Sequence, residues 1–369
     1  MKKPLIGQTS LFDEPINFTD TGVHDKKRLA ELQALPLERK IMITQTRIIE
    51  WYTKWKGQVY VSFSGGKDST VLLHIARQCF PDVEAVFVNT GLEYPEIQKF
   101  AKSFDNVTVL RPEMSFVDVI NTYGYPIISK EVSNTISGAR SSIKQRKYSL
   151  RLCKLGVSET EYGGLKNSGT YDYRKALSRS KFKQEKYRPL INTDFLISDK
   201  CCDVIKKSPL YGFGERTGKK PIIATMTTES QLREKNWLKF GCNAFSSHHP
   251  KSQPMSFWTE QDVLEYIRRY NLPIAQVYGE VLPADNGCKL CTTGCDRTGC
   301  IFCGFGAHMR DDDRFIRLKE THPRQYEYCI NGGEYNEDGW WVPNKTGLGM
   351  GHVFDELNKI YGDNFIRYK

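Results

Sequence analysis

Over its first 110 residues the chain alternates short apolar runs with amphipathic stretches. A short apolar run bounded by turn residues is typical of a buried strand, whereas apolar residues that recur every three to four positions are typical of a helix. These patterns predict a lead-in helix followed by alternating strands and helices: helix 37–55, strand 58–63, helix 69–78, strand 83–89, helix 95–104 and strand 107–110. Strands and helices that alternate at this spacing predict a parallel sheet with right-handed crossovers, covered on both faces.

The pattern changes twice after this region. Residues 135–220 are basic, rich in Ser and Tyr and without clear periodicity, which predicts an irregular insertion over the carboxyl edge of the sheet. An extended run at 221–226 and a helix at 259–270, with Thr259 as its N-cap, then complete the regular part. From residue 286 onward Cys and Gly dominate, apart from an expected helix at 314–326.

The strand at 58–63 leads directly into a polar loop that ends at the start of a helix. At such a place free backbone N–H groups and the positive end of the helix dipole face an anion, and glycines let the backbone approach it closely. Lys67 adds a cation, whose side chain should face solvent. The loop lacks the Gly-x4-Gly-Lys-Ser/Thr pattern of kinase-type loops, and the alternative interpretation is an ordinary Gly-Gly turn. The expected phosphate-binding residues are Ser64, Gly65, Gly66, Lys67, Asp68 and Ser69.

This loop resembles the SGGKDS loop (PP-loop) of the adenine nucleotide α-hydrolase superfamily, which includes ATP pyrophosphatases and sulfonucleotide reductases. Five later segments resemble, in order, the phosphoadenosine phosphosulfate (PAPS) reductase branch: 86–96 (VFVNTGLEYPE), 108–112 (TVLRP), 199–210 (DKCCDVIKKSPL), 224–233 (ATMTTESQLR) and 258–267 (WTEQDVLEYI). The resemblance covers about residues 59–274. It implies an α/β fold with a doubly wound, Rossmann-like parallel sheet and a small Cys-rich, metal-binding C-terminal unit.

The resemblance also implies site residues and domain bounds. Asn89 and Gly91 would join the loop in binding ATP or PAPS. Lys67 and Arg233 would stabilise charge on the phosphate oxygens during catalysis, and Asp68 would orient the loop or hold Mg²⁺. The expected divisions are a tail and lead-in helix at 1–56, a nucleotide-binding domain at 57–285 with the basic insertion, and a Cys-rich unit at 286–369.

The sequence departs from the reductases at one motif. Those enzymes attack sulfur with the cysteine of a Glu-Cys-Gly-x-His segment, and this sequence contains none. The leading hypothesis is therefore an ATP pyrophosphatase that adenylates an acceptor for sulfur transfer, with tRNA or DNA as the acceptor and a sulfur-donor protein as partner. The alternatives are a PAPS or adenylylsulfate reductase that uses another thiol, and a non-catalytic nucleic-acid- or partner-binding protein with structural zinc.

Six of the eleven cysteines lie between Cys288 and Cys329, mostly two to four residues apart, which favours metal binding over disulfides. On spacing, four thiolates bind zinc or an iron–sulfur cluster equally well. The segment at 297–306 resembles the cysteine segment of PAPS-reductase-like proteins of bacteria and phages, which favours iron–sulfur. The expected ligands are Cys295, Cys300, Cys303 and Cys329. A rival set is Cys201, Cys202, Cys288 and Cys291, and two centres are a further alternative.

Charge and the N-terminal residues bear on partners. The net charge is +10, and residues 130–220 hold 21 Lys and Arg against 9 Asp and Glu, which suits either a polyanion or a plain solvated surface around a nucleotide pocket. Residues 8–12, from Gln8 to Phe12, resemble the Gln-x-Ser-Leu-Phe peptide that docks on bacterial sliding clamps; the alternative is an unremarkable tail. Without a run of about eighteen apolar residues or an apolar leader, the chain is expected to be cytoplasmic and without membrane contact.

Overall fold

The computed structural model describes residues 24–167, 183–284, 287 and 289–369. They pack into two compact units, each formed by two stretches that are distant in sequence. Unit 1 comprises the described parts of Met1–Arg111 and Pro209–Thr298; unit 2 comprises those of Pro112–Ser208 and Gly299–Lys369. The candidate clamp peptide at 8–12 and Cys288 lie outside the described residues. None of the described helices is long and apolar enough to cross a membrane.

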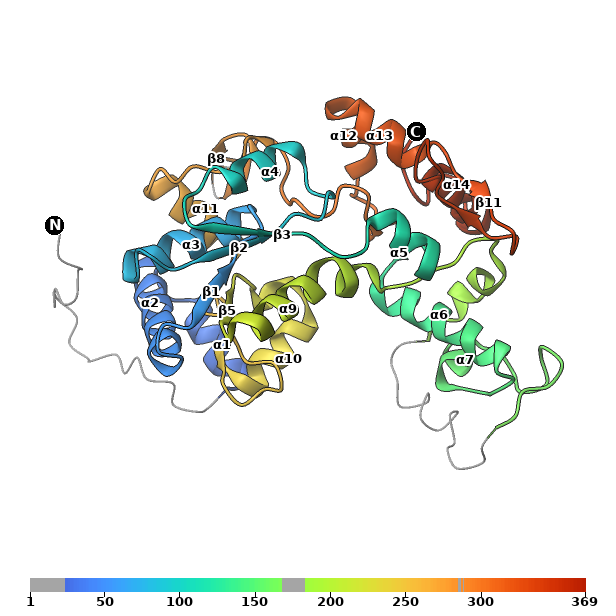
Figure 1. Cartoon of the computed structure of the whole chain (residues 1–369), viewed down its shortest axis with the longest axis horizontal. Coiled ribbons are helices and arrows are strands. Elements are labelled where there is room, and N and C mark those ends of the chain that lie inside the picture. Colours follow the sequence, from blue (N-terminus) through green and yellow to red (C-terminus); the bar gives the residue numbers. More distant parts are fainter. Residues whose placement is uncertain (1–23, 168–182, 285–286, 288) are drawn as a thin grey trace. The chain divides into compact units, whose positions relative to one another are not determined.

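Unit 1 is built on a six-stranded sheet of order β3-β2-β1-β5-β7-β6. Figure 1 labels its strands β1, β2, β3 and β5. All neighbouring strands are parallel except β6 and β7. The chain runs from β1 outward through β2 to β3 and later returns to place β5 on the other side of β1, so the strand order reverses at β1. The strands span Val59–Ser62 (β1), Ala85–Val88 (β2), Val107–Leu110 (β3), Lys220–Ile223 (β5), Asn243–Ala244 (β6) and Lys251–Ser252 (β7).

Apolar side chains leave this sheet on both faces. Val59 and Val61 of β1 belong to the main core with Trp51 and Leu72, whereas Tyr60 and its neighbour Val86 pack against Phe213. The mostly parallel, doubly wound sheet is therefore confirmed. The helices of unit 1 are α1 (Lys26–Gln33), α2 (Leu37–Lys54), α3 (Lys67–Cys79), α4 (Pro95–Lys102), α9 (Ser208–Thr217), which begins at the end of unit 2, α10 (Gln231–Phe240) and α11 (Glu260–Arg269).

The segment that follows α11 is held against that helix. The Thr259 side chain accepts from the Asp262 N–H, which confirms Thr259 as the N-cap of α11. The 3₁₀ turn η4 (Gln276–Tyr278) and the hairpin of β8 (Val281–Pro283) and β9 (Leu290–Thr292) follow. Gln261 exchanges two hydrogen bonds with the backbone of Leu290, at 3.0 and 2.8 Å, so α11 fixes the start of the segment that leads to Thr298. A further 3₁₀ turn, η3 (Thr227–Glu229), precedes α10.

Unit 2 joins the basic segment to the C-terminal residues. Strands β4 (Ile127–Ile128) and β10 (Gly304–Phe305) pair in parallel, and the Tyr125 hydroxyl donates to the Leu348 carbonyl oxygen at 2.8 Å. The remaining elements are α5 (Phe116–Tyr123), α6 (Lys130–Lys144), α7 (Leu150–Lys154), η1 (Glu185–Asn192), the π-helix η2 (Cys202–Lys207), α12 (Arg314–Thr321), α13 (Pro323–Ile330), β11 (Glu334–Tyr335), β12 (Trp341–Val342) and α14 (Met350–Tyr361). Because of this pairing, the two compact units each combine two separate stretches of the chain, and the domain bounds at 57–285 and 286–369 stay a prediction.

Two expectations about single elements were wrong. Residues 130–144 are a regular helix rather than an irregular stretch, with Ser129 as N-cap and the Arg140 guanidinium donating to the backbone oxygens of Leu190, Ile191 and Phe195. The helix expected at 314–326 is broken in two, because Pro323 disfavours a helical conformation at His322, whose φ is −136°.

Candidate functional site

The phosphate loop, residues 64–69, lies at the carboxyl end of the central strand β1 and leads into α3. In open α/β sheets, ligands bind beyond the carboxyl ends of the strands where the strand order reverses, and β1 is that position here. Gly65 has a φ of +72°, and a Cβ there would lie 3.0 Å from the side chain of Ile97. The loop therefore needs glycine at this position for its conformation and for its close approach to α4.

The two serines of the loop hold its shape. The hydroxyl groups of Ser64 and Ser69 share a hydrogen bond at 3.0 Å, and the Ser69 hydroxyl also donates to the Gly66 carbonyl oxygen at 2.9 Å. The Gly66 N–H donates to the Ser64 hydroxyl at 3.3 Å. These bonds cross-link the two ends of the loop, so its backbone is fixed independently of a bound anion.

Lys67 is only 3% exposed, so the expectation of a solvent-facing side chain was wrong. Its Nζ atom donates to the Asp296 carbonyl oxygen at 2.6 Å and lies 3.0 Å from Glu260 Oε1. Its backbone N–H donates to the hydroxyl of Tyr278 at 3.2 Å. The cation of the loop is thus engaged by oxygens from the segment after β9 and from the first turn of α11.

Asp68 follows Lys67 and carries an unusual carboxylate. Its Oδ1 atom is shielded from solvent and has no hydrogen-bond partner among the residues that the structure describes. Burial raises the pKa of Asp68, an effect that Lys67 opposes and the Glu260 carboxylate increases. Arg297 and Arg233, like Lys67, lower the pKa of Asp68 because they favour its charged form. An unpartnered oxygen amid three cations suits a site where further charged groups bind.

Arg233 lies in the first turn of α10 and forms an ion pair with Glu229. Burial lowers the pKa of Arg233, and the nearby Arg297 lowers it further, whereas Asp68 raises it. The structure therefore brings together all three residues that the resemblance marked as catalytic, Lys67, Asp68 and Arg233.

Asn89 and Gly91 follow β2, the strand next to β1, at the same edge of the sheet. The Asn89 Oδ1 atom accepts from the Gly91 N–H at 3.3 Å, and the Thr90 hydroxyl donates to Glu93 at 2.6 Å, which closes a tight turn. Gly91 has a φ of +76°, and a Cβ there would meet no atom within 4 Å. This turn therefore leaves open space beside Gly91 at the carboxyl edge of the sheet.

Sequence reasoning missed five residues that contact the loop or its charges. They come from α11, η4 and the segment after β9: Glu260, Tyr278, Asp296, Arg297 and Thr298. One signal in the sequence was the polar run Asp296-Arg297-Thr298 between Cys295 and Cys300. A loop that only binds a metal needs no charged residues, so this run could have indicated a second role.

Four cysteines of unit 2 form a cluster, which we call the thiol cluster: Cys201, Cys202, Cys300 and Cys303. The Cys201 and Cys202 sulfur atoms lie 3.9 Å apart at the start of η2. The hydrogen bond with Cys202 and burial raise the pKa of Cys201, and Cys303 and Cys300 raise it further. Burial, with the neighbouring Cys300 and Cys202, raises the pKa of Cys303 to about 11. Apart from the contact between Cys201 and Cys202, it is these mutual electrostatic effects that group the four thiols.

One thiol of the cluster has the opposite shift. The hydrogen bond from Cys201 lowers the pKa of Cys202, as do the cations Lys130 and Lys206. A thiolate at this position is therefore favoured, and thiolate is the form that binds metals and acts as a nucleophile.

The other two expected ligands have different surroundings. Cys295 belongs to unit 1, where it is buried and its backbone N–H donates to Val277. Cys329 is fully buried, its thiol contacts the Met350 sulfur at 3.6 Å, and burial raises its pKa. Within the described ranges, no three His, Cys, Asp or Glu side chains are arranged as ligands of one metal ion.

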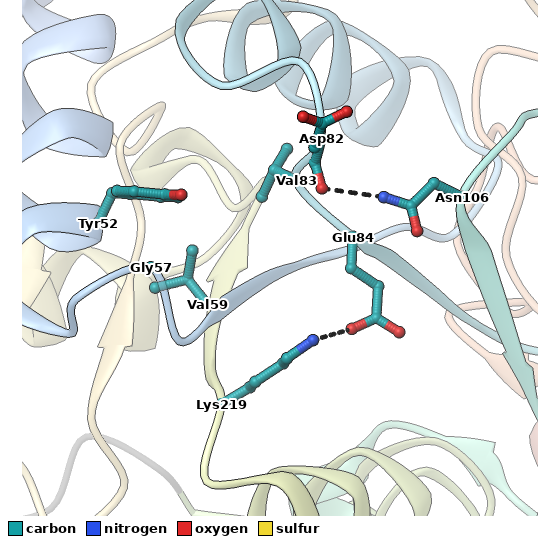
Figure 2. A pocket seen from close by; sticks show the side chains of 8 residues that line it. All are labelled: Tyr52, Gly57, Val59, Asp82, Val83, Glu84, Asn106 and Lys219. Atoms are coloured by element: carbon teal, nitrogen blue, oxygen red, sulfur yellow. Dashed lines mark hydrogen bonds and ion pairs between the residues drawn. The ribbon is translucent and has the colours of Figure 1, made fainter.

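A cavity of about 280 Å³ opens at the opposite edge of the unit 1 sheet (Figure 2). Its lining includes Val59, Glu84 and Lys219, which precede or begin β1, β2 and β5 at their amino ends. Lys219 and Glu84 form an ion pair at 2.6 Å, and Asn106 donates to the Asp82 carbonyl oxygen at 2.9 Å. Two pairs of its polar groups thus bind each other, and no residue of the phosphate loop lines the cavity.

Comparison with protein families gives one extended match. The model of the phosphoadenosine phosphosulfate reductase domain matches residues 58–148 and 164–304. Two curated relatives are uncharacterized proteins of Methanocaldococcus jannaschii. MJ0973 is 34% identical over 95 residues, which cover 24% of this chain and 23% of that protein, and MJ0066 is 37% identical over 81 residues, which cover 20% and 17%. The chain therefore spans less than a quarter of either relative.

Two solved structures are distantly similar. One is a PAPS reductase from Candida auris, with 13% identity and a TM-score of 0.33 over 68% of this chain and 90% of that one. The other is an FMN adenylyltransferase from Candida glabrata, with 14% identity and a TM-score of 0.33 over 68% of this chain and 65% of that one.

Proposed function

We propose that this chain, which belongs to the phosphoadenosine phosphosulfate reductase domain family, binds ATP through residues 64–69 and adenylates an acceptor for sulfur transfer. The observation that supports this most strongly is the convergence of Lys67, Asp68 and Arg233 at the carboxyl end of β1. A fixed loop with a helix N-terminus and three nearby cations, Arg297 included, suits a polyphosphate, which carries several negative charges.

The reaction would be a displacement at the α-phosphorus. An acceptor oxygen bonds to the α-phosphorus, the bond to the bridging oxygen breaks, and pyrophosphate leaves with the electron pair. Lys67 and Arg233 would stabilise the negative charge that builds on the phosphate oxygens in the transition state. Such electrostatic stabilisation is usually the largest contribution to the rate of these reactions. The acceptor then carries AMP, which a sulfur nucleophile can displace.

Asp68 is the residue that fits Mg²⁺. Its shielded Oδ1 atom lacks a partner among the described residues, and a carboxylate oxygen is the ligand that Mg²⁺ prefers. When bound, Mg²⁺ would neutralise charge on the phosphate oxygens. Asp68 would thereby hold Mg²⁺ beside the phosphate loop, next to Lys67.

We propose that the thiol cluster binds the metal centre once its side chains move together, since no three of the described residues are arranged as ligands of one metal ion. Four thiols are a complete donor set for an iron–sulfur cluster or zinc, and Lys130 and Lys206 favour the thiolate form beside them. Both sets expected from the sequence share two residues with this one: Cys300 and Cys303 in the first set, and Cys201 and Cys202 in the rival set. When bound, an iron–sulfur centre would supply redox or sulfur-handling chemistry.

Exposed cations in unit 2 support a nucleic acid as the acceptor. We call Lys144, Arg146, Lys147 and Lys166 the basic turn. All four side chains are exposed, and the Lys166 N–H donates to the Arg146 carbonyl oxygen at 2.9 Å, which holds the two strands of the turn together. Four exposed cations on two adjoining backbone segments would attract a phosphate backbone more strongly than isolated surface charges would.

The test is pyrophosphate release from ATP labelled in its γ-phosphate, by protein purified without oxygen. Release should require Mg²⁺ and should rise when tRNA or DNA is added. Asp68→Asn should abolish it. A protein that instead releases sulfite from PAPS is a sulfonucleotide reductase, and the low pKa of Cys202 is the observation that favours this second candidate. A protein that releases neither product but retains nucleic-acid binding is a binding protein.

A further inference from the structure

The segment Asp296-Arg297-Thr298 lies directly against the phosphate loop. The Asp296 carbonyl oxygen accepts from Lys67 Nζ, and the Thr298 hydroxyl shares a hydrogen bond with Tyr278, whose hydroxyl accepts from the Lys67 N–H. A Cβ added at Gly66 would lie 3.2 Å from the Tyr278 hydroxyl and 3.5 Å from the Thr298 hydroxyl. Asp296 therefore contacts the Lys67 side chain, and Thr298 reaches the Lys67 backbone through Tyr278.

Arg297, between them, differs from the other charged groups of the site. Lys67 is paired with Glu260, and Arg233 with Glu229, but Arg297 has no hydrogen-bond or ion-pair partner within the described parts of the chain. Its side chain is exposed. Because long cationic side chains at built sites are usually paired, an unpaired arginine next to a phosphate loop is a candidate ligand for an anion.

The charges around Arg297 favour the binding of an anionic ligand there. Arg297 lies near enough to Arg233 to lower the pKa of Arg233, and both arginines favour the charged form of Asp68. Two arginines next to one half-buried carboxylate leave positive charge uncompensated. A polyphosphate would compensate it, and the guanidinium group binds two phosphate oxygens at once.

We propose that Arg297 is a phosphate-binding residue of the nucleotide site, and that Asp296 and Glu260 hold the Lys67 cation in the place of phosphate oxygens until a nucleotide binds. This inference rests on the proposed nucleotide binding at residues 64–69. The phosphates would take over Lys67 from the Asp296 carbonyl oxygen, and Arg297 would close on them from the same segment. The ligand class is a di- or triphosphate, since AMP offers no terminal phosphates for Arg297 to reach.

The experiment is isothermal titration of ATP, AMP and inorganic pyrophosphate into the full chain, with Arg297→Ala, Arg297→Lys and Lys67→Ala variants. Because Arg297 is exposed and unpaired, its replacement should leave the thermal unfolding midpoint unchanged. Arg297→Ala should weaken ATP and pyrophosphate binding about tenfold or more, as expected for a lost charge-assisted bond, and AMP binding should not change. Arg297→Lys should lose less than Arg297→Ala.

The matched control is Lys54→Ala, which removes the same charge from an exposed site before the amino end of β1, whereas the loop follows the carboxyl end. If Arg297→Ala binds ATP as the wild type and Lys54→Ala do, while Lys67→Ala binds it more weakly, the role of Arg297 is refuted and nucleotide binding by the loop stands. If the wild type binds neither ATP nor pyrophosphate, the proposed function fails, and the inference fails with it.

Discussion

Lys67 Nζ lies 2.6 Å from the carbonyl oxygen of Asp296, a residue 229 positions further along the chain. The same Nζ atom lies 3.0 Å from Glu260 Oε1. The cation that the sequence predicts for phosphate binding is therefore already bound by the protein's own oxygens. A nucleotide must compete with them, and this competition can be measured.

Glu260→Gln should bind ATP more tightly than the wild type. The substitution removes a carboxylate that competes with phosphate for Lys67 and that repels phosphate directly. Because the Glu260 side chain is 42% exposed, its pairing energy is that of a partly solvated ion pair, so the gain should be about two- to fivefold. Titration calorimetry at low and high salt measures it.

Glu265→Gln is the control for that variant, because it removes an equal charge from the same helix, where Glu265 pairs with Arg269 instead. An affinity that falls in Glu260→Gln would show that Glu260 supports nucleotide binding rather than competing with it.

Asp68 should make stability depend on pH. Burial raises the pKa of Asp68 in the folded chain, and Glu260 raises it further, whereas the cations Lys67, Arg297 and Arg233 lower it. Because the net shift is upward, ionisation of Asp68 destabilises the folded chain. The contribution of Asp68 to the free energy of unfolding is greatest below the ordinary carboxyl pKa, and it declines as pH rises through the raised folded-state pKa. Asp68→Asn should therefore unfold at a higher temperature than the wild type at pH 8, and the difference should shrink toward pH 3.

Glu38→Gln, in the same unit, is a control in which the stability should change with pH in the opposite direction, because backbone hydrogen bonding and Arg269 lower the pKa of Glu38. It should be less stable than the wild type at pH 8, and the difference should shrink as pH falls through the lowered folded-state pKa of Glu38. A stability difference for Asp68→Asn that does not vary with pH would rule out a raised pKa at Asp68.

Much of unit 1 could be predicted from the sequence, because its signals are local. Strand β3 is an uninterrupted apolar and threonine run, and the loop stands between a strand and a helix in the order that phosphate binding needs. The N-cap Thr259 needs only its own neighbours. The burial of Lys67 was not predictable, because it depends on Asp296 and Glu260, which approach only in the folded chain.

Unit 2 was harder to predict for the same reason. Helix α6 buries Ser133 and Thr135 beside Val132 and Ile136, so small polar residues obscure its apolar stripe. The thiol cluster joins Cys201 and Cys202 to cysteines about 100 positions later, and sequence spacing instead grouped the cysteines that are neighbours along the chain.

Cys201→Ser/Cys202→Ser and Cys300→Ser/Cys303→Ser should each lose the metal, because each removes two of the four proposed ligands. Unit 2 should become more sensitive to protease, while unit 1 keeps its ATP affinity. Iron, sulfide and zinc analysis after anaerobic purification measures the loss. Roughly equal iron and sulfide with absorbance near about 400 nm identifies an iron–sulfur cluster, and colourless protein with zinc identifies a structural site.

Cys329→Ser distinguishes the ligand sets, since Cys329 belongs to the set expected from the sequence and not to the thiol cluster. It should retain the metal. Loss of metal in this variant, with retention in Cys201→Ser/Cys202→Ser, would overturn the assignment in favour of the sequence-based set.

Replacing Lys144, Arg146 and Lys147 by Ala should weaken tRNA or DNA binding at every sequence tested. Each phosphate contact contributes about 0.7–0.9 to the slope of log affinity against log salt concentration, so three lost contacts should reduce that slope by about two to three. Fluorescence anisotropy over a salt series measures it. An unchanged slope would exclude the basic turn as a phosphate-binding surface.

The most direct test of nucleotide binding is the affinity of the wild type and of Lys67→Ala for ATP, by titration calorimetry at one fixed salt concentration. Several charge-assisted hydrogen bonds should give the wild type an affinity in the micromolar range. Loss of the cation should weaken binding by about 1.5–3 kcal/mol, which is roughly tenfold to more than a hundredfold. Equal ATP affinity in the two proteins, with both folded by circular dichroism, would contradict phosphate binding at residues 64–69.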